Sequence, residues 1–539
     1  MWRWMVITLL FHANASPASG ATAAEVWRSD LRLLARELPS RHPAPFIHVT
    51  RAQWDSATAS LDRRIPSMSR NQRLVGFMQL VALVGDAHTV VETDSSFALR
   101  FYPLELYSFE DGLFVRSADG AHASWAGARV LRLGRVTAEE AMRRIATILP
   151  HENEGWVRAF GPLQLTIPEV IDGLGLAADV GRLSLVVERD GKTDTASIAP
   201  AGVIPNAHRN APVPIDMSDW ASMRTGPAPL WEQHPGEFFW WSFDAKTKTL
   251  YVCQRAVSPS PGSFDNRAQW NQVFAMADSV KPAQLVIDLR ENLGGNGGLN
   301  RYPVQQILRR PWLDRRERLF VIIGRRTFSA GQQFTNLLEA WTQATLIGEP
   351  TGQRPSQYGD HRPLRLPGTG LTVQISSVFH QAPNEFDRRD FVAPRIYTPL
   401  DSKSYRGGID PAMMAVMEPD TTNVMAAIEH AVAGNDTVTA ERELTAARDK
   451  PSNRFRSFES ETNALGYRLL AARKLEQALV VFRLNTRAYP GSANTFDSLG
   501  EALLSAGYRE AAIDAYRKAL ALDPNFQSSA HALRGLGVH

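Results

Sequence analysis

Hydrophobic positions follow different periods along the chain, and the changes of period predict how the chain is organised. Residues 25–90 carry apolar side chains at the 3.6-residue spacing of packed helices, most clearly at 26–38 and 72–84. From residue 101 to about 200 the pattern is mixed, and it predicts one helix over 137–148. Short strands are predicted at 101–107, 113–116, 129–133, 183–189 and 192–198.

The middle of the chain predicts a layered α/β core. Continuous apolar runs typical of buried strands occur at 250–254, 285–289 and 319–323. Helical stretches at 267–280 and 302–308 separate these runs. Because strands alternate with helices, we expect a largely parallel sheet, and the chain as a whole should be a multi-domain α/β protein.

The C-terminal segment contains an internal repeat. Leu465, Gly466, Ala478, Phe482 and Pro490 recur 34 residues later as Leu499, Gly500, Ala512, Tyr516 and Pro524. This spacing is typical of tetratricopeptide helix pairs, which often bind a protein partner. Two copies are fewer than a free-standing array needs, so we expect a third, degenerate helix pair or packing on the core to complete the stack.

Composition excludes several classes of function. The 539 residues are 44% hydrophobic and 21% charged, as in ordinary globular proteins with sizeable cores. A formal net charge of +3 gives no strong field for nucleic acid. The single cysteine, Cys253, allows neither a disulfide framework nor a thiolate metal cluster. Since no His, Cys or carboxylate cluster has metal-ligand spacing, we expect no metal and no cofactor.

The first 20 residues have the pattern of a signal peptide. Arg3 gives a positive start, residues 5–11 are apolar, and Ala13 to Ala15 fit a small-x-small cleavage site. A short membrane anchor is the alternative. No later stretch approaches the roughly 20 apolar residues that a membrane span requires. We therefore expect a periplasmic or secreted mature chain without a stable membrane span.

Ser329 lies between the apolar run at 319–323 and a helical pattern over 332–343. A serine at a strand-to-helix turn lies near unpaired backbone N–H groups and the positive end of the helix dipole. These features suit an acyl-transfer nucleophile beside an oxyanion hole. Alternatively, Ser329 only caps the helix, and Gln332 completes a Ser-x-x-Gln capping box.

Five short strings follow one another between residues 85 and 411. They are Gly85-Asp-Ala-His-Thr, Asp288-Leu-Arg-Glu-Asn-Leu-Gly-Gly, Ser329-Ala-Gly-Gln, Gly348-Glu-Pro-Thr-Gly and Gly407-Gly-Ile-Asp-Pro. In this order they resemble the tail-specific or C-terminal-processing serine peptidases, including the tricorn-core and interphotoreceptor retinoid-binding branch. The likeness covers about residues 25–420, and Ala87 replaces a glycine that is usual in the family.

The resemblance implies an architecture and an activity. It implies a crotonase/ClpP-like α/β serine peptidase core at 206–435, after an N-terminal helical domain at 21–95 and a PDZ-like domain at 96–205. The signal peptide at 1–20 and the tetratricopeptide repeat region at 457–539 flank these parts. The implied activity is hydrolysis of peptide bonds in a peptide or protein substrate.

The general base requires a separate argument. The processing branch of the family uses a lysine that follows its serine, but no lysine occurs between Lys281 and Lys403. Arg354 is near the expected place, but a guanidinium stays protonated and cannot accept a proton. The tricorn-like branch takes a histidine from the N-terminal domain, and His88 matches that position. Its ordinary pKa suits a general base, although His88 could instead only cap the preceding helix.

Three acids, Glu385, Asp387 and Asp390, lie where the tricorn-like pattern places the carboxylate that orients the histidine. We predict that Asp387 has this role, by fixing the imidazole tautomer. The same six-residue window could instead be a solvated loop.

Backbone N–H groups are the predicted oxyanion donors. We expect them at Ala330 and at Gly294 or Gly295, because glycine lets a substrate approach the backbone closely. The alternative for the glycine-rich stretch is a flexible turn. Asp288, Thr351 and Gly352 are expected to support the site, since they belong to the strings described above.

Two other functions stay open at this point. The chain could be an inactive pseudopeptidase that binds a peptide or an apolar ligand, as some retinoid-binding relatives keep the fold without needing proteolysis. It could also be an assembly adaptor that recruits a partner through its repeats.

Overall fold

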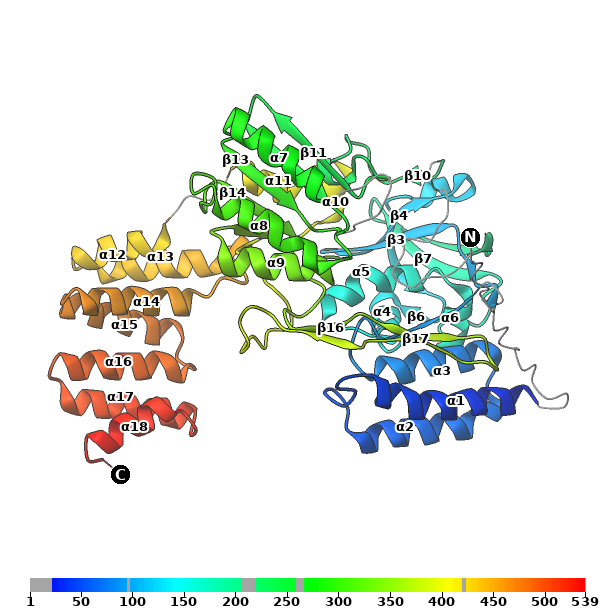
Figure 1. Ribbon diagram of the computed structural model, residues 1–539, viewed down its shortest axis with the longest axis horizontal. Helices are drawn as coiled ribbons and strands as arrows, with labels where there is room; N and C mark the ends of the chain where they lie inside the picture. Colours follow the sequence, from blue (N-terminus) through cyan, green and yellow to red (C-terminus); the bar gives the residue numbers. More distant parts are fainter. Residues whose placement is uncertain are drawn as a thin grey trace, which may run out of the picture.

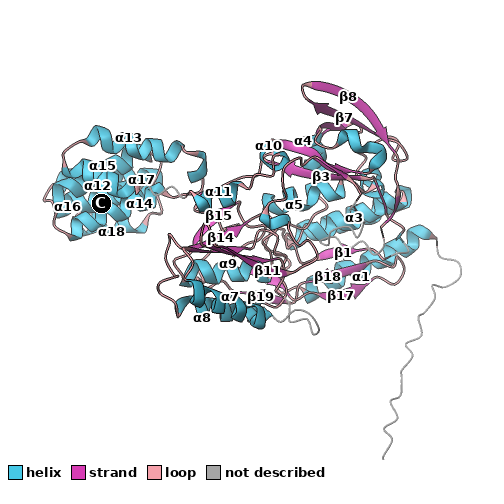
Figure 2. Cartoon of the chain, turned by 90° about the horizontal axis from the view of Figure 1, so that it is seen from above, coloured by secondary structure: helices cyan, strands magenta, loops and turns pink. Residues whose placement is uncertain are grey.

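The computed structural model describes residues 22–94, 97–204, 217, 219–257, 266–418 and 423–538. The predicted signal peptide at 1–20 lies outside the described residues. Within the described ranges, no helix is long and apolar enough to cross a membrane. The C-terminal helices form an arm beside the rest of the molecule, and both views show it as a separate lobe (Figures 1 and 2).

The predicted α/β core is present, and its sheet has the strand order β11-β12-β13-β14-β15-β20. The strands are β11 (Phe239–Asp244), β12 (Thr249–Gln254), β13 (Gln284–Asp288), β14 (Leu319–Ile323), β15 (Thr345–Gly348) and β20 (Ile396–Tyr397). All neighbouring strands run parallel except β11 and β12.

Helices cover both faces of this sheet. One face packs on α7 (Asn266–Val280), α8 (Arg301–Leu308) and α9 (Ala330–Trp341), and the other packs on α11 (Pro411–Met417). In β13, Leu285 and Ile287 face the first layer, while Val286 faces the second. Burial on both faces explains why these strands are continuous apolar runs in the sequence.

The N-terminal region contains α1 (Ala23–Arg41), α2 (Arg51–Arg64) and α3 (Arg70–Ala82). Each helix begins with a complete capping box. After α3, strand β1 (Val90–Glu92) pairs with β18 (Thr372–Ile375), which also pairs with β17 (Arg362–Arg365). The β17–β18 hairpin, which comes from the C-terminal side of the insert in the sequence, therefore binds the N-terminal region and brings residues near 88 toward the core.

The insert between these parts contains an antiparallel sheet. Its main strands are β3 (Leu104–Phe109), β4 (Gly112–Ala118), β5 (Arg129–Leu133), β7 (Leu183–Arg189) and β8 (Lys192–Ile198). Three helices accompany the sheet: α4 (Ala138–Ala146), α5 (Glu154–Gln164) and α6 (Pro168–Gly173). The insert shares one apolar core with α1 to α3 and with β17 and β18. The predicted boundary near residue 95 thus falls inside a continuous core, and the PDZ-like character stays a prediction.

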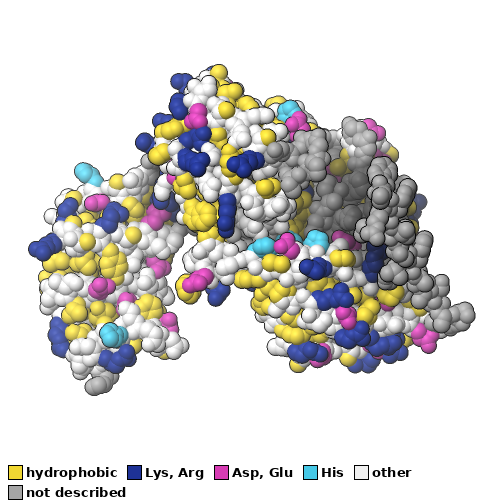
Figure 3. Space-filling view, in the orientation of Figure 1, with side chains coloured by type: hydrophobic (Ala, Val, Ile, Leu, Met, Phe, Trp, Pro, Cys, Tyr) yellow, Lys and Arg dark blue, Asp and Glu magenta, His cyan; other side chains and the backbone are white. Residues whose placement is uncertain are grey.

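The C-terminal arm has a core of its own. It consists of α12 (Val424–Ala433), α13 (Thr437–Asp449), α14 (Phe458–Ala471), α15 (Leu475–Ala488), α16 (Ala493–Ser505), α17 (Arg509–Leu522) and α18 (Gln527–Gly535). In the space-filling view a notch separates the arm from the N-terminal helices (Figure 3).

Close packing between helices explains why glycine recurs in the 34-residue repeat. A Cβ added at Gly466 would lie 2.7 Å from the Phe482 ring, and one added at Gly500 would lie 2.7 Å from the Tyr516 ring. Each glycine therefore lets the next helix pack closely. Helices α12 and α13 form a further pair in the same core, so the arm begins at Val424, before the predicted start at 457.

Candidate active site

Ser329 lies in the sharp turn between β14 and α9. Its backbone has φ 53° and ψ −122°, a conformation that residues other than glycine rarely adopt. Its side chain makes no capping hydrogen bond to α9. The Nε2 of Gln332 instead donates to Asn336 Oδ1 at 2.8 Å. The capping box considered from the sequence is therefore not formed, and the serine is held in a strained turn.

This strain predicts a measurable effect on stability. We expect Ser329→Gly to unfold with a free energy about 1 kcal/mol higher than Ser329→Ala, because only glycine adopts this backbone conformation without strain. Neither variant has the hydroxyl, so the comparison isolates the backbone. Thermal denaturation of the two variants is the measurement, and a glycine variant that melts at or below the alanine variant would contradict the strain.

Gly294 packs directly against Ser329. A Cβ added at Gly294 would lie 2.5 Å from Ser329 Cβ and 3.0 Å from its hydroxyl oxygen. The N–H of Gly294 donates to Asn292 Oδ1 at 2.9 Å, so this group is already occupied. Among the described residues, no hydrogen bond involves the backbone N–H of Gly295 or Ala330. Of the predicted oxyanion donors, Ala330 and Gly295 are therefore available, and Gly294 provides room.

Asp288 supports the site from the end of β13. Its carboxylate accepts hydrogen bonds from Tyr251 Oη at 2.7 Å and from Arg290 Nε at 3.0 Å. The other end of Arg290 binds the carboxylate of Asp410 at 3.0 and 2.8 Å. The Asp-x-Arg string and the Gly-Gly-Ile-Asp-Pro string thus meet in one buried ion-pair network, which fixes the loop that leads to Gly294.

Thr351 and Gly352 hold the loop after β15 in place. The Oγ1 of Thr351 donates to the carbonyl of Gln353 at 3.1 Å, and the N–H of Gly352 donates to the carbonyl of Thr327 at 3.2 Å. Gln353, the next residue, accepts a hydrogen bond from the N–H of Ser329 at 2.6 Å through its Oε1. Thr351 and Gly352 therefore help to position a side chain that binds the backbone of Ser329.

His88 reaches the same place from the N-terminal region. Its ring stacks on Phe328, with centroids 4.3 Å apart and planes at 25°. Its Nδ1 lies 3.2 Å from Nε2 of Gln353. One side-chain amide thus contacts both Ser329 and His88, so the structure brings these two predicted residues together. Among the hydrogen bonds of the described residues, none joins the Ser329 hydroxyl to the His88 ring.

Burial controls the charge of His88. It lowers the pKa of His88 to about 4, although the nearby carboxylate of Asp86 favours the charged ring. The Nδ1 of His88 is 3.9 Å from Oδ1 of Asp86. Burial raises the pKa of Asp86, but hydrogen bonds from His42, Ser376 and Thr89 and the charge of His88 outweigh it and set the pKa at about 2. At neutral pH the site therefore holds a neutral imidazole beside an ionised carboxylate.

Glu152 and Gln353 are site residues that the sequence reasoning missed. The Oε1 of Glu152 accepts from Gln353 Nε2 at 3.0 Å, and its Oε2 accepts from the N–H of Arg354 at 2.8 Å. Burial and the charge of Asp86 raise the pKa of Glu152 to about 8. Gln353 follows the Gly-Glu-Pro-Thr-Gly string directly, which was its only signal. Glu152 lies between α4 and α5, outside every motif.

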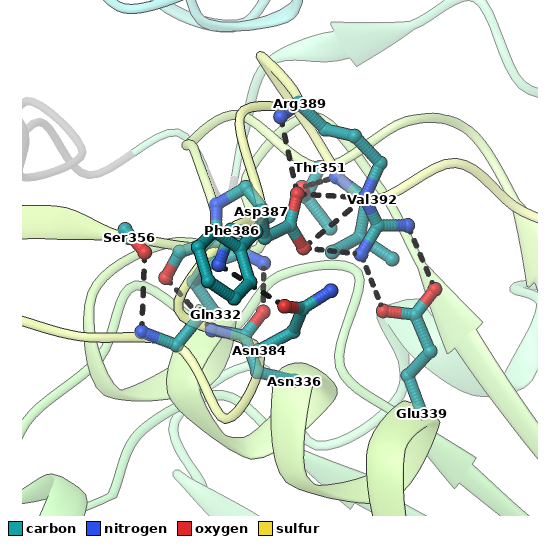
Figure 4. Close-up of polar contacts among 12 residues, drawn as sticks. Gln332, Asn336, Glu339, Thr351, Ser356, Asn384, Phe386, Asp387, Arg389 and Val392 are labelled. Carbon is teal, nitrogen blue, oxygen red and sulfur yellow. Dashed lines mark hydrogen bonds and ion pairs between the residues drawn. The ribbon is translucent and has the colours of Figure 1, made fainter. Parts of the chain in front are cut away.

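Asp387 does not reach His88, so the structure does not support its predicted orienting role. Its carboxylate binds Arg389 at 3.0 and 2.7 Å, and Arg389 also binds Glu339 at 2.7 Å (Figure 4). The reason is that the guanidinium of Arg389, two residues further along the chain, binds both oxygens of the Asp387 carboxylate.

The other two acids of that window also lie elsewhere. Asp390 Oδ1 accepts from Arg354 Nη2 at 2.7 Å, and Glu385 is exposed. The carboxyl groups beside His88 are instead Asp86, which lies next to the ring, and Glu152, which reaches it through Gln353.

A cavity of about 560 Å³ lies between the insert and the strand ends of the core. Its lining includes Leu104, Phe160, Leu163, Trp231 and Arg325. Helix α5 contributes Phe160 and Leu163 to this lining, while its Trp156 stacks on Phe328 with centroids 4.2 Å apart. The same helix therefore contacts the cavity and the segment that carries Ser329.

Comparison with known proteins shows a shared fold. Mature CPAF in complex with lactacystin matches 74% of this chain and 100% of its own chain, with a TM-score of 0.53 and 13% identity. A second crystal structure of mature CPAF matches 75% of this chain and 99% of its own, with a TM-score of 0.52 and 14% identity. No family model and no curated protein matches the sequence. The predicted multi-domain α/β fold class is thus confirmed.

Proposed function

We propose that this chain is a serine-type endopeptidase of the tail-specific kind, with Ser329 as nucleophile and His88 as general base. One observation carries the proposal. Ser329 occupies a strained turn at the start of α9, and a single amide, that of Gln353, contacts both its backbone and the His88 ring. The five family-like strings and the CPAF-like fold support the same conclusion.

The chemistry follows from the positions of these groups. The Ser329 oxygen attacks the peptide carbonyl carbon while His88 takes the hydroxyl proton. The backbone N–H groups of Ala330 and Gly295 hold the oxyanion that forms. When the C–N bond breaks, His88 returns the proton to the leaving amine, and water then hydrolyses the ester on Ser329 in a second, equivalent cycle.

The electrostatics of the site suit this cycle. With a pKa of about 4, His88 is neutral at neutral pH, so one of its two ring nitrogens carries no proton. The ionised Asp86 next to it stabilises the imidazolium that forms in the transition state. No cofactor takes part in this proposal.

The proposal is tested by incubating the purified protein with an unstructured peptide. We expect cleavage into fragments, and we expect a serine-reactive fluorophosphonate to stop it at one equivalent per chain. Peptide binding without cleavage, together with no labelling, would instead favour the inactive pseudopeptidase.

We also propose a location for the protein and a role for its C-terminal arm. The pattern of residues 1–20 supports a location outside the cytoplasm, and sequencing the N-terminus of the mature protein tests it.

The separate core of the C-terminal arm supports a role as an interaction surface for a protein partner. A deletion that tests this role must remove the arm from Val424 onward, because a cut at 457 would divide its core. Partners recovered equally with and without the arm would dismiss it.

A further inference from the structure

The orientation of the Gln353 amide is fixed by the backbone of Ser329. A backbone N–H can only donate, so the Gln353 atom 2.6 Å from Ser329 N is the amide oxygen. The amide nitrogen then points the other way, and its two hydrogens face His88 Nδ1 at 3.2 Å and Glu152 Oε1 at 3.0 Å. Turning the amide over would place two donors, the N–H of Ser329 and the NH₂ group, against each other.

This orientation determines which nitrogen of His88 carries the proton. Because Gln353 donates to Nδ1, that nitrogen presents its lone pair, and the single proton of the neutral ring lies on Nε2. Neither nitrogen is then free to accept the Ser329 proton, since Nδ1 is occupied and Nε2 is already protonated. The absence of a Ser329–His88 hydrogen bond among the described residues agrees with this state.

The insert holds the amide in this position. Glu152 accepts hydrogen bonds both from Gln353 Nε2 and from the backbone N–H of Arg354. Beside it, the Nδ2 of Asn153 donates to the carbonyl of Thr351 at 3.1 Å. Two consecutive residues of the insert thus bind the loop that carries Gln353, and they lie 201 and 198 positions away from their partners on it.

We propose that Gln353 and Glu152 are positioning residues that keep His88 in an unreactive tautomer, so that the structure shows a resting state. Release of the amide from Nδ1 allows that nitrogen to bind a proton while Nε2 loses one, and the ring then has a free lone pair for the Ser329 hydroxyl. The ring stays neutral throughout. The inference rests on the proposed function, because it concerns the same serine and histidine.

An exchange of the two side chains tests the proposal. In the double variant Glu152→Gln with Gln353→Glu, the carboxylate at position 353 accepts from the N–H of Ser329 and from a proton on His88 Nδ1. The new amide at position 152 donates to that carboxylate, and its oxygen accepts from the N–H of Arg354. Every hydrogen bond keeps a donor and an acceptor, the pair still holds one carboxyl group and one amide, and only the tautomer of His88 reverses.

We expect the double variant to react with a fluorophosphonate at Ser329 at least tenfold faster than the natural protein. In serine triads, an amide in place of the orienting acid costs about 10⁴-fold in rate through the wrong tautomer. The matched control exchanges charge at two exposed positions, Glu154→Gln with Gln381→Glu, and should label at the natural rate. A merely structural role for Gln353 predicts slower labelling in the double variant, not faster labelling.

The outcomes separate the two proposals. If the double variant folds and labels at the natural rate or more slowly, the resting-state proposal is wrong and the peptidase proposal stands. If neither protein labels at Ser329, the peptidase proposal itself fails. If the double variant does not fold, the labelling rate of the single variant Glu152→Gln tests the resting-state proposal instead. Its amide oxygen can accept from only one of the two N–H groups, so labelling should be about fivefold faster. An unchanged or lower rate would overturn the proposal.

Discussion

Ser329→Ala should lower kcat/KM for an unstructured peptide by at least about 10⁴-fold while the fold stays unchanged. In the proposed mechanism the hydroxyl forms the acyl-enzyme, and we expect the variant to keep the same backbone in this turn. The residual rate should come from the oxyanion donors and substrate binding alone. KM should change little, since the hydroxyl contributes mainly in the transition state.

Ser377→Ala provides the matched control for this prediction. Ser377 lies just before β19 (Val378–His380), which pairs with β16 (Gln357–Gly359), and its hydroxyl donates to the carbonyl of Asp360. Its removal should leave kcat/KM unchanged. Full activity in Ser329→Ala, with an unchanged circular dichroism spectrum, would remove Ser329 from the mechanism.

His88→Ala should have the second largest effect, a fall of about 10³-fold or more in kcat/KM, because His88 is the proposed base, stacks on Phe328 beside Ser329 and shares the Gln353 amide with Ser329. The matched control is His234→Ala, which removes an exposed ring bonded to Glu237. An activity that survives the loss of His88 but not the loss of Ser329 would require a different base.

The pH profile of the natural protein gives an independent test of His88. Burial lowers its pKa from the ordinary value of 6.5 to about 4, so the ring stays neutral until the pH falls through about 4. Because only the neutral ring can accept a proton, kcat/KM should hold down to about pH 5 and decline below it. Asp86, with a pKa of about 2, stays ionised over this range. A fall of kcat/KM that begins near pH 6.5 would instead show that the base is a solvated histidine.

Local patterns predicted the elements of the fold well. Strands β5, β7, β8 and β14 have the bounds that alternation or a continuous apolar run predicted. This works because each signal is contained within the element, in the form of burial on one or both faces and turn residues at its ends. The repeat in the arm was visible for the same reason, since Gly466 and Gly500 meet an aromatic ring of the next helix.

The site was predicted only in part, because its remaining members depend on contacts between distant segments. Ser329 and His88 were found through short strings, and the structure brings them to one amide. Glu152 has no string of its own, and its role arises from a contact 201 positions along the chain. Asp387 lies at the sequence position expected for the orienting acid, but its carboxylate binds Arg389 instead of His88. A window of three acids cannot reveal which neighbour each carboxylate will bind.

The central claim is that an acyl-enzyme forms on Ser329 with the help of His88. The most direct measurement maps the fluorophosphonate adduct by tandem mass spectrometry in the natural protein and in His88→Ala. The account predicts one adduct, on Ser329, in the natural protein and greatly slowed labelling in the variant. An adduct on a different serine, or none at all in a preparation that cleaves peptide, would contradict it.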